Sequence, residues 1–149
     1  VRGTFDGFSG TIVTSENPAE NSVTAEIDMA TINTNQADRD GHLRTNDFFN
    51  VEQFPTTTFT STSIAIDGDD LTIEGDLTLR GVTKPITLKG EFGGIATNPY
   101  GQTIAAASAS TVINRTDFGV NYNAALETGG VLLGEDVTLN FDLQAALQQ

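Results

Sequence analysis

Alternation of apolar and polar residues dominates this chain, and it predicts β-strands. The clearest run covers residues 71–79, where Leu, Ile and Gly at odd positions alternate with Thr, Glu and Asp at even positions. Successive side chains of a strand point to opposite faces, so this pattern is typical of a strand with one buried face. The same pattern predicts strands over residues 23–29, 71–79, 86–92 and 137–143.

Three further segments are rich in Thr, Ser, Ala and β-branched residues and are bounded by Gly, Asn or Pro. These segments are residues 5–13, 57–66 and 103–113. They bring the expected number of strands to about seven. Residues 67–70, reading DGDD, predict a tight turn because Asp and Gly tolerate positive φ. The strands on either side of that turn are expected to pair as a hairpin.

Helical patterns are confined to residues 36–44 and to a few residues around 115–118. Neither segment is long enough to cover a sheet, so the sheet must cover itself. The sequence therefore predicts an all-β antiparallel barrel or sandwich. Parallel α/β folds are disfavoured because they need crossover helices.

Small residues recur on the presumed inner face of this sheet. In one register they are Ala25, Gly75, Gly90, Ala105, Ala107 and Ala109. Small side chains leave volume unfilled, which favours a hollow barrel that holds one ligand over a compact sandwich. The alternative is that a large neighbour or the sheet twist explains each glycine separately.

The charge balance of the chain excludes some partners. The sequence has 20 Asp and Glu against 7 Lys and Arg, a net charge of -13. Such a surface repels nucleic-acid phosphates, so no nucleic-acid partner is expected. The absence of cysteine excludes disulfides and thiolate metal sites. No apolar run approaches the roughly 20 residues of a membrane span.

Residues 35–59 form a charge-rich, aromatic insert between predicted strands, and they hold the only histidine, His42. His42 would have to serve any nucleophilic mechanism, and no G-x-S-x-G elbow is present. The spacing of Asp38, Asp40 and His42 is similar to that of an EF-hand loop, but Leu43 and Phe49 stand where that loop needs Gly and Glu. Zinc would require more His or Cys ligands. We therefore expect neither catalytic nor metal-ligating residues.

Several motifs run in the order of a known family. They are VRGTF at 1–5, FSG at 8–10, DRDGHLR at 38–44, DFF at 47–49, FPTTTF at 54–59, GDLTLRGVTKP at 75–85, NRTDFGV at 114–120 and GEDV at 134–137. With these motifs the chain resembles the YceI-like, polyisoprenoid-binding proteins of bacteria. The resemblance extends over nearly the whole sequence, and it implies a single domain over residues 1–149.

The resemblance implies a lipocalin-like antiparallel β-barrel of about eight strands, with one or two short helices in the insert. Its apolar pore would take a long-chain lipid, typically a polyprenyl compound or an isoprenoid quinone, and no catalytic residue or other cofactor is implied. An apolar tunnel suits such a ligand because each buried methylene contributes roughly 0.8 kcal/mol. The expected lining residues are Ile27, Met29, Phe48, Phe49, Phe54, Phe59, Ile73, Leu77, Phe92, Phe118 and Phe141. At the pore mouth, Arg39, His42 and Tyr122 are expected to meet a polar head group.

Two features depart from the family pattern. The family begins with a further strand before the position of Val1, so either the sequence omits that strand or the barrel closes by exchange with a second copy, as a homodimer. The family often has Trp near the position of Tyr122, which leaves the ligand class better defined than the ligand.

The leading functional hypothesis is non-enzymatic binding, with transport or storage, of a polyisoprenoid or isoprenoid quinone. One alternative is an enzyme that acts on an isoprenoid or a sugar through His42. Another is a solidly packed structural or carbohydrate-binding β-module. Because family members are often exported, we expect a periplasmic or extracellular location, with the cytoplasm as the alternative, and transient contact with a membrane or membrane protein.

Overall fold

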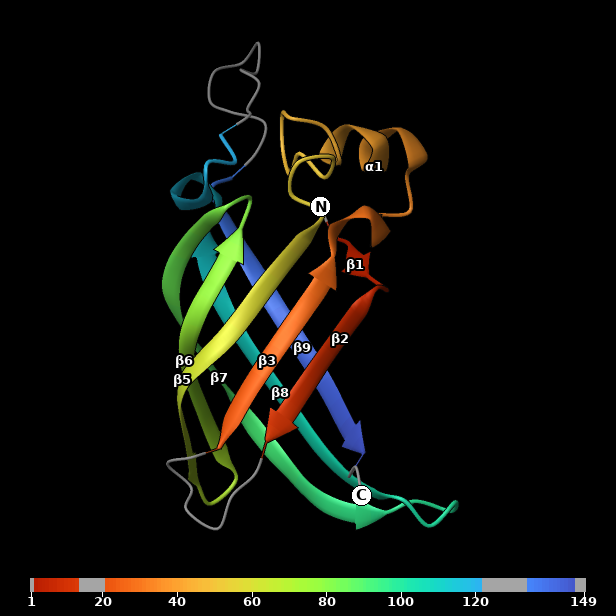
Figure 1. Ribbon diagram of the computed structural model, residues 1–149, viewed down its shortest axis with the longest axis vertical. Helices are drawn as coiled ribbons and strands as arrows, with labels where there is room; N and C mark the ends of the chain where they lie inside the picture. The colour runs from red at the N-terminus through yellow and green to blue at the C-terminus, as the bar shows by residue number, and fades with distance from the viewer. Residues whose placement is uncertain (1, 14–20, 122–133, 147–149) are drawn as a thin grey trace.

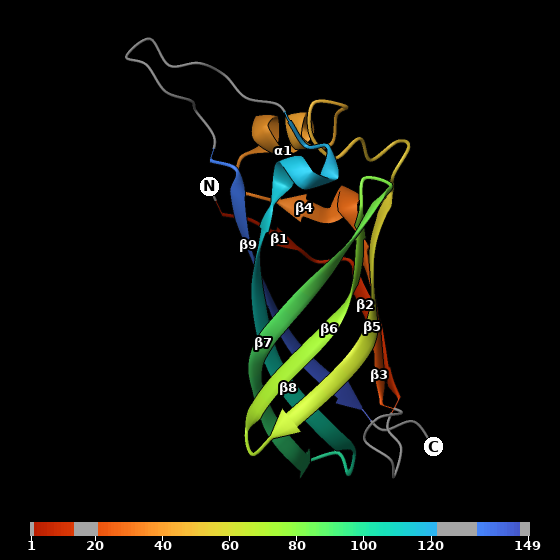
Figure 2. The ribbon, with the colours of Figure 1, turned by 90° about the vertical axis from the view of Figure 1, so that its left-hand side faces the viewer.

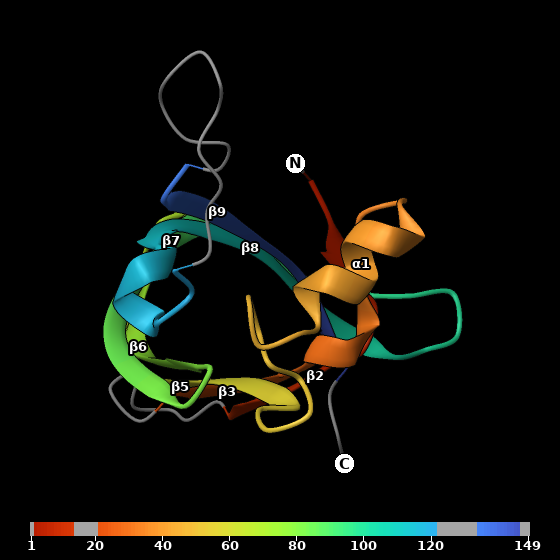
Figure 3. The ribbon, with the colours of Figure 1, turned by 90° about the horizontal axis from the view of Figure 1, so that it is seen from above.

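The protein is a strongly curled antiparallel β-sheet, seen from the side in Figure 1 and from above in Figure 3. The computed structural model describes residues 2–13, 21–121 and 134–146. Neighbours along the sheet are, in order, β2 (Phe8–Val13), β3 (Ser22–Asp28), β5 (Thr56–Asp67), β6 (Asp70–Leu79), β7 (Val82–Thr97), β8 (Thr103–Asn114) and β9 (Asp136–Ala146). All-β architecture is thereby confirmed.

Short elements gather at one end of the curled sheet, which we call the α1 end (Figure 2). A two-stranded ladder joins β1 (Thr4–Phe5) to β4 (Ile32–Asn33). At the same end lie the 3-10 helix η2 (Met29–Thr31), the helix α1 (Ala37–Leu43) and, on the opposite side of the sheet opening, the 3-10 helix η3 (Arg115–Phe118). In the described part of the chain, no helix has the length and apolar character needed to cross a bilayer.

The four strongly alternating segments and the two short helices are where the sequence predicts them, although the strands run further. β7, for example, covers 16 residues and extends beyond the predicted 86–92 at both ends. Residues 68 and 69 form a two-residue turn between β5 and β6, with Gly68 at φ 63°. The hairpin prediction for residues 67–70 is therefore confirmed.

Two predicted boundaries are wrong, and local hydrogen bonds explain both. Residues 5–13 do not form one strand, because the Gly7 carbonyl accepts from Asp28 N at 2.6 Å and the Gly7 amide donates to Thr31 Oγ1 at 3.0 Å. These bonds turn the chain away between β1 and β2. Met29 does not end β3, because the Asp28 carboxylate accepts from Ala30 N at 3.1 Å and starts η2 there.

Two β-bulges reverse the alternation within single strands. In β5, Ser61 pairs with Gly75 and Ser63 with Glu74, so Thr62 is an extra residue. In β7, Phe92 pairs with Ala107 and Gly94 with Ala106, with Gly93 between them. An extra residue moves every later side chain of that strand to the other face. A single alternation of inward and outward side chains therefore does not run through the whole of β5 or β7.

The sheet edges β2 and β9 approach each other without a described ladder between them. Across this seam the rings of Phe8 and Phe141 lie 6.4 Å apart, centre to centre. The described sheet therefore closes through side chains at this point and stays open as a hydrogen-bonded barrel.

The glycines of the inner face do not leave empty volume. A Cβ at Gly75 would lie 2.5 Å from the Thr60 carbonyl oxygen and 2.6 Å from the Phe59 ring, and one at Gly90 would lie 1.8 Å from the Ser108 carbonyl oxygen. These contacts correct the argument that Gly75 and Gly90 mark a hollow. A large neighbour explains the first glycine, and close approach of β8 explains the second.

Candidate functional site

The concave face of the curled sheet carries mostly apolar side chains, interrupted by polar ones such as Thr57 and Lys84, which pair with Ile27 and Leu77. Residues paired across an antiparallel ladder lie on the same face, so the register identifies the whole series. Leu77, for example, pairs with Phe59 on β5, and Ile73 pairs with Ile64 on β5 and Leu88 on β7. We call this series the inner face.

Burial of the inner face falls from one end to the other. Near the α1 end, Met29, Leu77 and Phe118 are only 2–3% exposed. Toward the opposite end, Ile66 is 48% exposed although it lies on the inner face opposite the buried Leu71. Ile95, opposite Ala105, is 67% exposed.

Edge strand β2 shows the same exposure. Its inner-face residues Phe8 and Ile12 pair with Ile27 and Val23 and are 39% and 37% exposed. Large apolar side chains that face inward and still meet solvent indicate an incompletely filled concave surface. The inner face is thus available to an apolar ligand on the side away from α1.

The α1 end is covered by the segment 45–55, which we call the cap loop. Phe48 is buried under it and meets the His42 ring edge to face at 5.0 Å between centres. Phe49 makes a similar contact with Phe5 at 6.4 Å. Phe54 lies against Gly81, where a Cβ would come within 2.6 Å of the ring. The predicted insert is therefore a roof over the buried end of the inner face.

A buried polar network orders the start of this roof. The Thr34 hydroxyl and amide donate to Asp40 Oδ1 at 2.5 and 2.9 Å. Arg39 donates to the Thr34 hydroxyl at 2.8 Å and to the Thr34 carbonyl at 2.7 Å. The hydrogen bond from the Thr34 hydroxyl is the main reason why the pKa of Asp40 is lowered, and the Thr34 amide, Arg44 and Arg39 act in the same direction against the effect of burial.

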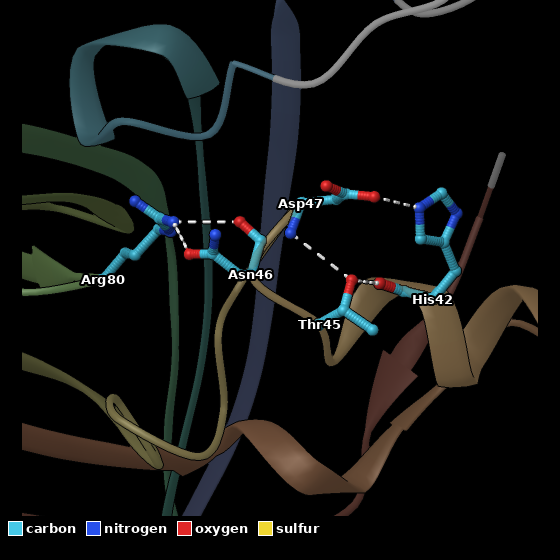
Figure 4. Close-up of polar contacts among 5 residues, drawn as sticks. All are labelled: His42, Thr45, Asn46, Asp47 and Arg80. Carbon is cyan, nitrogen blue, oxygen red and sulfur yellow. Dashed lines mark hydrogen bonds and ion pairs between the residues drawn. The ribbon is translucent and has the colours of Figure 1, made fainter.

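The cap loop is held at two sides, as Figure 4 shows. On one side His42 Nε2 lies 2.8 Å from Asp47 Oδ2, and the Thr45 hydroxyl donates to the His42 carbonyl at 2.6 Å. On the other side the Arg80 guanidinium donates to the carbonyl and the side-chain oxygen of Asn46, at 2.9 and 2.8 Å. The loop is therefore anchored to α1 and to the β6–β7 turn.

Arg80 holds this position at a conformational cost. It has φ 52°, and Gly81 after it has φ 75°, so both residues of the two-residue turn are in the left-handed region. Turns of this kind favour Asn or Gly, and a bulky residue there is uncommon. Its buried Nε has no hydrogen-bond partner among the described residues. The contacts with Asn46 give a reason for arginine at this position.

The predicted lining residues fall into two groups. Met29, Phe59, Ile73, Leu77 and Phe118 share one buried cluster, with Ile27, Phe49 and Phe141 packed against it. Phe48, Phe54 and Phe92 lie outside that cluster. Eight of the predicted lining residues thus belong to this core cluster or pack against it, and contact of any lining residue with a ligand stays a prediction.

The predicted mouth residues have structural partners or lie outside the described residues. Arg39 donates a hydrogen bond to Thr34, and His42 is paired with Asp47 of the cap loop. Tyr122 lies outside the described residues. A role in head-group binding stays a prediction for all three.

Sequence reasoning missed the exposed inner-face residues Phe8, Ile12, Ile66 and Ile95. Phe8, Gly10 and Ile12 do alternate with Ser9 and Thr11, so the first two could have been found. The bulges at Thr62 and Gly93 hide Ile66 and Ile95, because both residues change face after an extra residue.

Two shallow pockets in the described residues lie along the strands. One, of about 290 Å³, is lined by residues of β2, β3 and β5 such as Thr11, Ala25 and Phe59. The other, of about 180 Å³, lies between β7 and β8 near Lys84 and Phe118. Neither of these two is an enclosed apolar tunnel, and a lipid-binding pore stays a prediction. Among the described residues no three His, Asp or Glu side chains gather as metal ligands.

Comparison with known proteins agrees with this geometry. A protein named YceI from Escherichia coli O17:K52:H18 is 47% identical over 119 residues, which are 79% of this chain and 62% of that protein. The chain thus spans less than two thirds of such relatives.

Solved structures show the same fold. The Campylobacter jejuni YCEI protein is 31% identical with a TM-score of 0.83, covering 100% of this chain and 86% of the other. A polyisoprenoid binding domain from Saccharophagus degradans, implicated in plant cell wall breakdown, has a TM-score of 0.66 at 19% identity, covering 94% and 82% of the two chains.

At the level of sequence families, residues 1–145 match the YceI-like domain. Together with the 47% identity to a YceI protein, this match is the evidence for the assignment. The chain belongs to the YceI-like domain family.

Proposed function

We propose that the chain binds a long-chain apolar lipid of the polyisoprenoid class on its inner face, without chemical change to the lipid. The observation that carries the proposal is the exposure of inward-facing hydrophobic side chains, above all Ile66 and Ile95 at 48% and 67%. A lipid chain laid along them would remove apolar surface from water, at roughly 25 cal/mol per Å². The similar fold of a polyisoprenoid binding domain supports the same class of ligand.

The proposed role of the protein is to carry or store this lipid in the periplasm or outside the cell. A noncovalent site lined by aliphatic and aromatic side chains can hold an apolar chain without specific polar contacts. His42 supports this non-enzymatic proposal, because its ring is engaged by Asp47 and Phe48 in ordering the cap loop.

The test is mass spectrometry of an organic extract of the freshly purified protein, against protein that has been unfolded, washed and refolded. We expect one isoprenoid lipid per chain in the first sample and its recovery by the second after incubation with a polyprenyl phosphate or a quinone. A clean extract and no reloading would contradict the proposal.

A matched pair of variants locates the site. Ala105 lies on the inner face opposite Ile95, whereas its neighbour Ala106 pairs with Gly94 on the outer face, and both are partly buried. Ala105→Trp is expected to lower the bound lipid at least fivefold because the indole occupies the ligand's surface. Ala106→Trp should retain it. Equal retention by both variants would place the lipid elsewhere.

A separate variant addresses the enzyme alternative. His42→Ala is expected to leave the mass of the bound lipid unchanged, whatever its effect on the amount retained. Accumulation of a lipid of different mass in this variant would show that His42 takes part in a reaction.

A further inference from the structure

Exposed apolar side chains gather at the end of the molecule opposite α1. We call them the apolar rim: Ile12, Val13, Ile66, Ile95 and Tyr100. Their exposed fractions run from 37% for Ile12 to 88% for Tyr100. They come from the end of β2, the β5–β6 hairpin and the β7–β8 hairpin, all of which point away from α1 in Figures 1 and 2.

The rim is continuous with the inner face. Ile12, Ile66 and Ile95 belong to both, since they pair with the inner-face residues Val23, Leu71 and Ala105. An apolar chain leaving the inner face at this end would pass directly over them. Val13 and Tyr100 lie outside the inner face, so their exposure calls for a partner other than the enclosed ligand.

Most basic residues lie near the α1 end, but acidic residues are present at both ends. Of the chain's 7 Lys and Arg residues, all except Lys89 lie near the α1 end. They precede β1, belong to α1, its C-cap or η3, or lie in or just after the β6–β7 turn. The rim end carries the exposed Asp67, Asp69 and Asp70 in the β5–β6 turn. An anionic surface would be repelled by these aspartates, and a neutral one would not.

We infer that the apolar rim docks on the surface of a zwitterionic phospholipid bilayer and that lipid passes between bilayer and inner face there. This inference rests on the proposed function, since a polyisoprenoid is delivered to or taken from a bilayer. Tyr100 suits such a surface because an exposed aromatic ring with a hydroxyl favours the membrane–water interface. The α1 end, closed by the cap loop, faces away from the membrane.

Tryptophan fluorescence provides a direct test because the chain contains no tryptophan. Tyr100→Trp places the probe on the rim, and Val112→Trp places it on an outer position that is 60% exposed and lies two residues before the end of β8 near η3. With phosphatidylcholine vesicles free of isoprenoid, we expect the Tyr100→Trp emission to shift to the blue and to be quenched by brominated lipid. The Val112→Trp emission should not change. No shift for Tyr100→Trp, or equal shifts for both, would overturn the inference.

Reversal of the rim charge gives a second and independent measurement. Asp67→Lys combined with Asp69→Lys is expected to raise the fraction sedimenting with phosphatidylglycerol vesicles at least fivefold over the natural chain. Asp38→Lys combined with Asp117→Lys, near the α1 end, should raise the sedimenting fraction less. The opposite ranking would show that the α1 end meets the membrane.

The two proposals fail separately. Vesicles without isoprenoid test docking alone, and the organic extract tests lipid binding alone. Val13→Ser with Tyr100→Ser is expected to retain bound lipid while its transfer to acceptor vesicles slows at least fivefold. Transfer at the natural rate would overturn the role of the rim even where lipid binding holds.

Discussion

At the scale of single residues, the α1 end is ordered by hydrogen bonds between a few polar side chains. The Thr34 hydroxyl forms hydrogen bonds with both Asp40 and Arg39. Removal of any one of these three side chains leaves a buried polar group without its hydrogen-bond partner. Such loss costs more than a hydrogen bond gains, because the remaining group has been taken out of water.

Asp40→Asn should destabilise the protein most at neutral pH. The folded-state pKa of Asp40 is below its ordinary value of 3.8, so its ionised form is the one that the fold stabilises. This contribution is complete above the unfolded-state pKa and is lost as the pH falls through the lower folded-state pKa. In urea unfolding, the difference between the natural chain and Asp40→Asn should narrow from pH 7 to pH 3. A difference that widens at pH 3 would contradict this assignment.

Arg80 and Asn46 should be coupled energetically. We expect a double-mutant cycle of Arg80→Gly and Asn46→Ala to give a coupling free energy of about 0.5–1.5 kcal/mol, since both changes remove the hydrogen bond from the guanidinium to the side-chain oxygen of Asn46. Glycine is chosen because it relieves the positive φ of residue 80. The measurement is urea unfolding of the four proteins. Simple additivity would mean that the hydrogen bond to the side-chain oxygen of Asn46 does not contribute to anchoring the cap loop.

At the scale of elements, the pairing of β7 with β8 requires a glycine where the two backbones approach closely. Gly90 on β7 pairs with Ala109 on β8, and no side chain fits between these backbones. Gly41 on α1 has nothing within 4 Å of a Cβ position. The two glycines therefore separate a packing requirement from a helix-propensity effect.

Gly90→Ala should destabilise the protein by about 3 kcal/mol or more, because the strands must separate to admit the methyl group. Gly41→Ala should stabilise it by about 0.5–1 kcal/mol, because Ala is favoured over Gly within a helix. Chemical unfolding measures both. A mild effect of Gly90→Ala would show that β7 and β8 can shift apart without loss of pairing.

At the scale of the whole molecule, a net charge of -13 on a single small fold creates self-repulsion. The repulsion opposes compaction, and salt screens it over a distance that falls from about 30 Å at 0.01 M to about 10 Å at 0.1 M. Close pairs of basic and acidic side chains, whose attraction salt would also screen, are few among the described residues.

The melting temperature should therefore rise by roughly 2–4 °C between 0.01 and 0.3 M NaCl, which corresponds to about 1 kcal/mol of relief. Differential scanning calorimetry measures it, and choline chloride is the control for specific sodium binding. A fall in melting temperature with salt would mean that ion pairs outweigh the repulsion.

Much of the fold could be predicted from the sequence because its signals are local. Leu71, Ile73, Leu77 and Leu79 alternate, and all are buried on one face of β6. The insert 35–59 is recognisable by composition, and its helix α1 lies within the predicted residues 36–44. The exposed part of the candidate site could not be predicted, because the faces of Ile66 and Ile95 depend on bulges whose positions are set by pairing with β6 and β8.

The sequence by itself determined the all-β class, the segments that form strands, the β5–β6 turn and the apolar character of one face, since each follows from period-two alternation and turn chemistry. The tertiary structure alone decided which end of that face is covered. Phe48 and Phe118 are buried at one end while Ile95 is exposed at the other. Burial is a property of distant neighbours, and no local pattern contains that information.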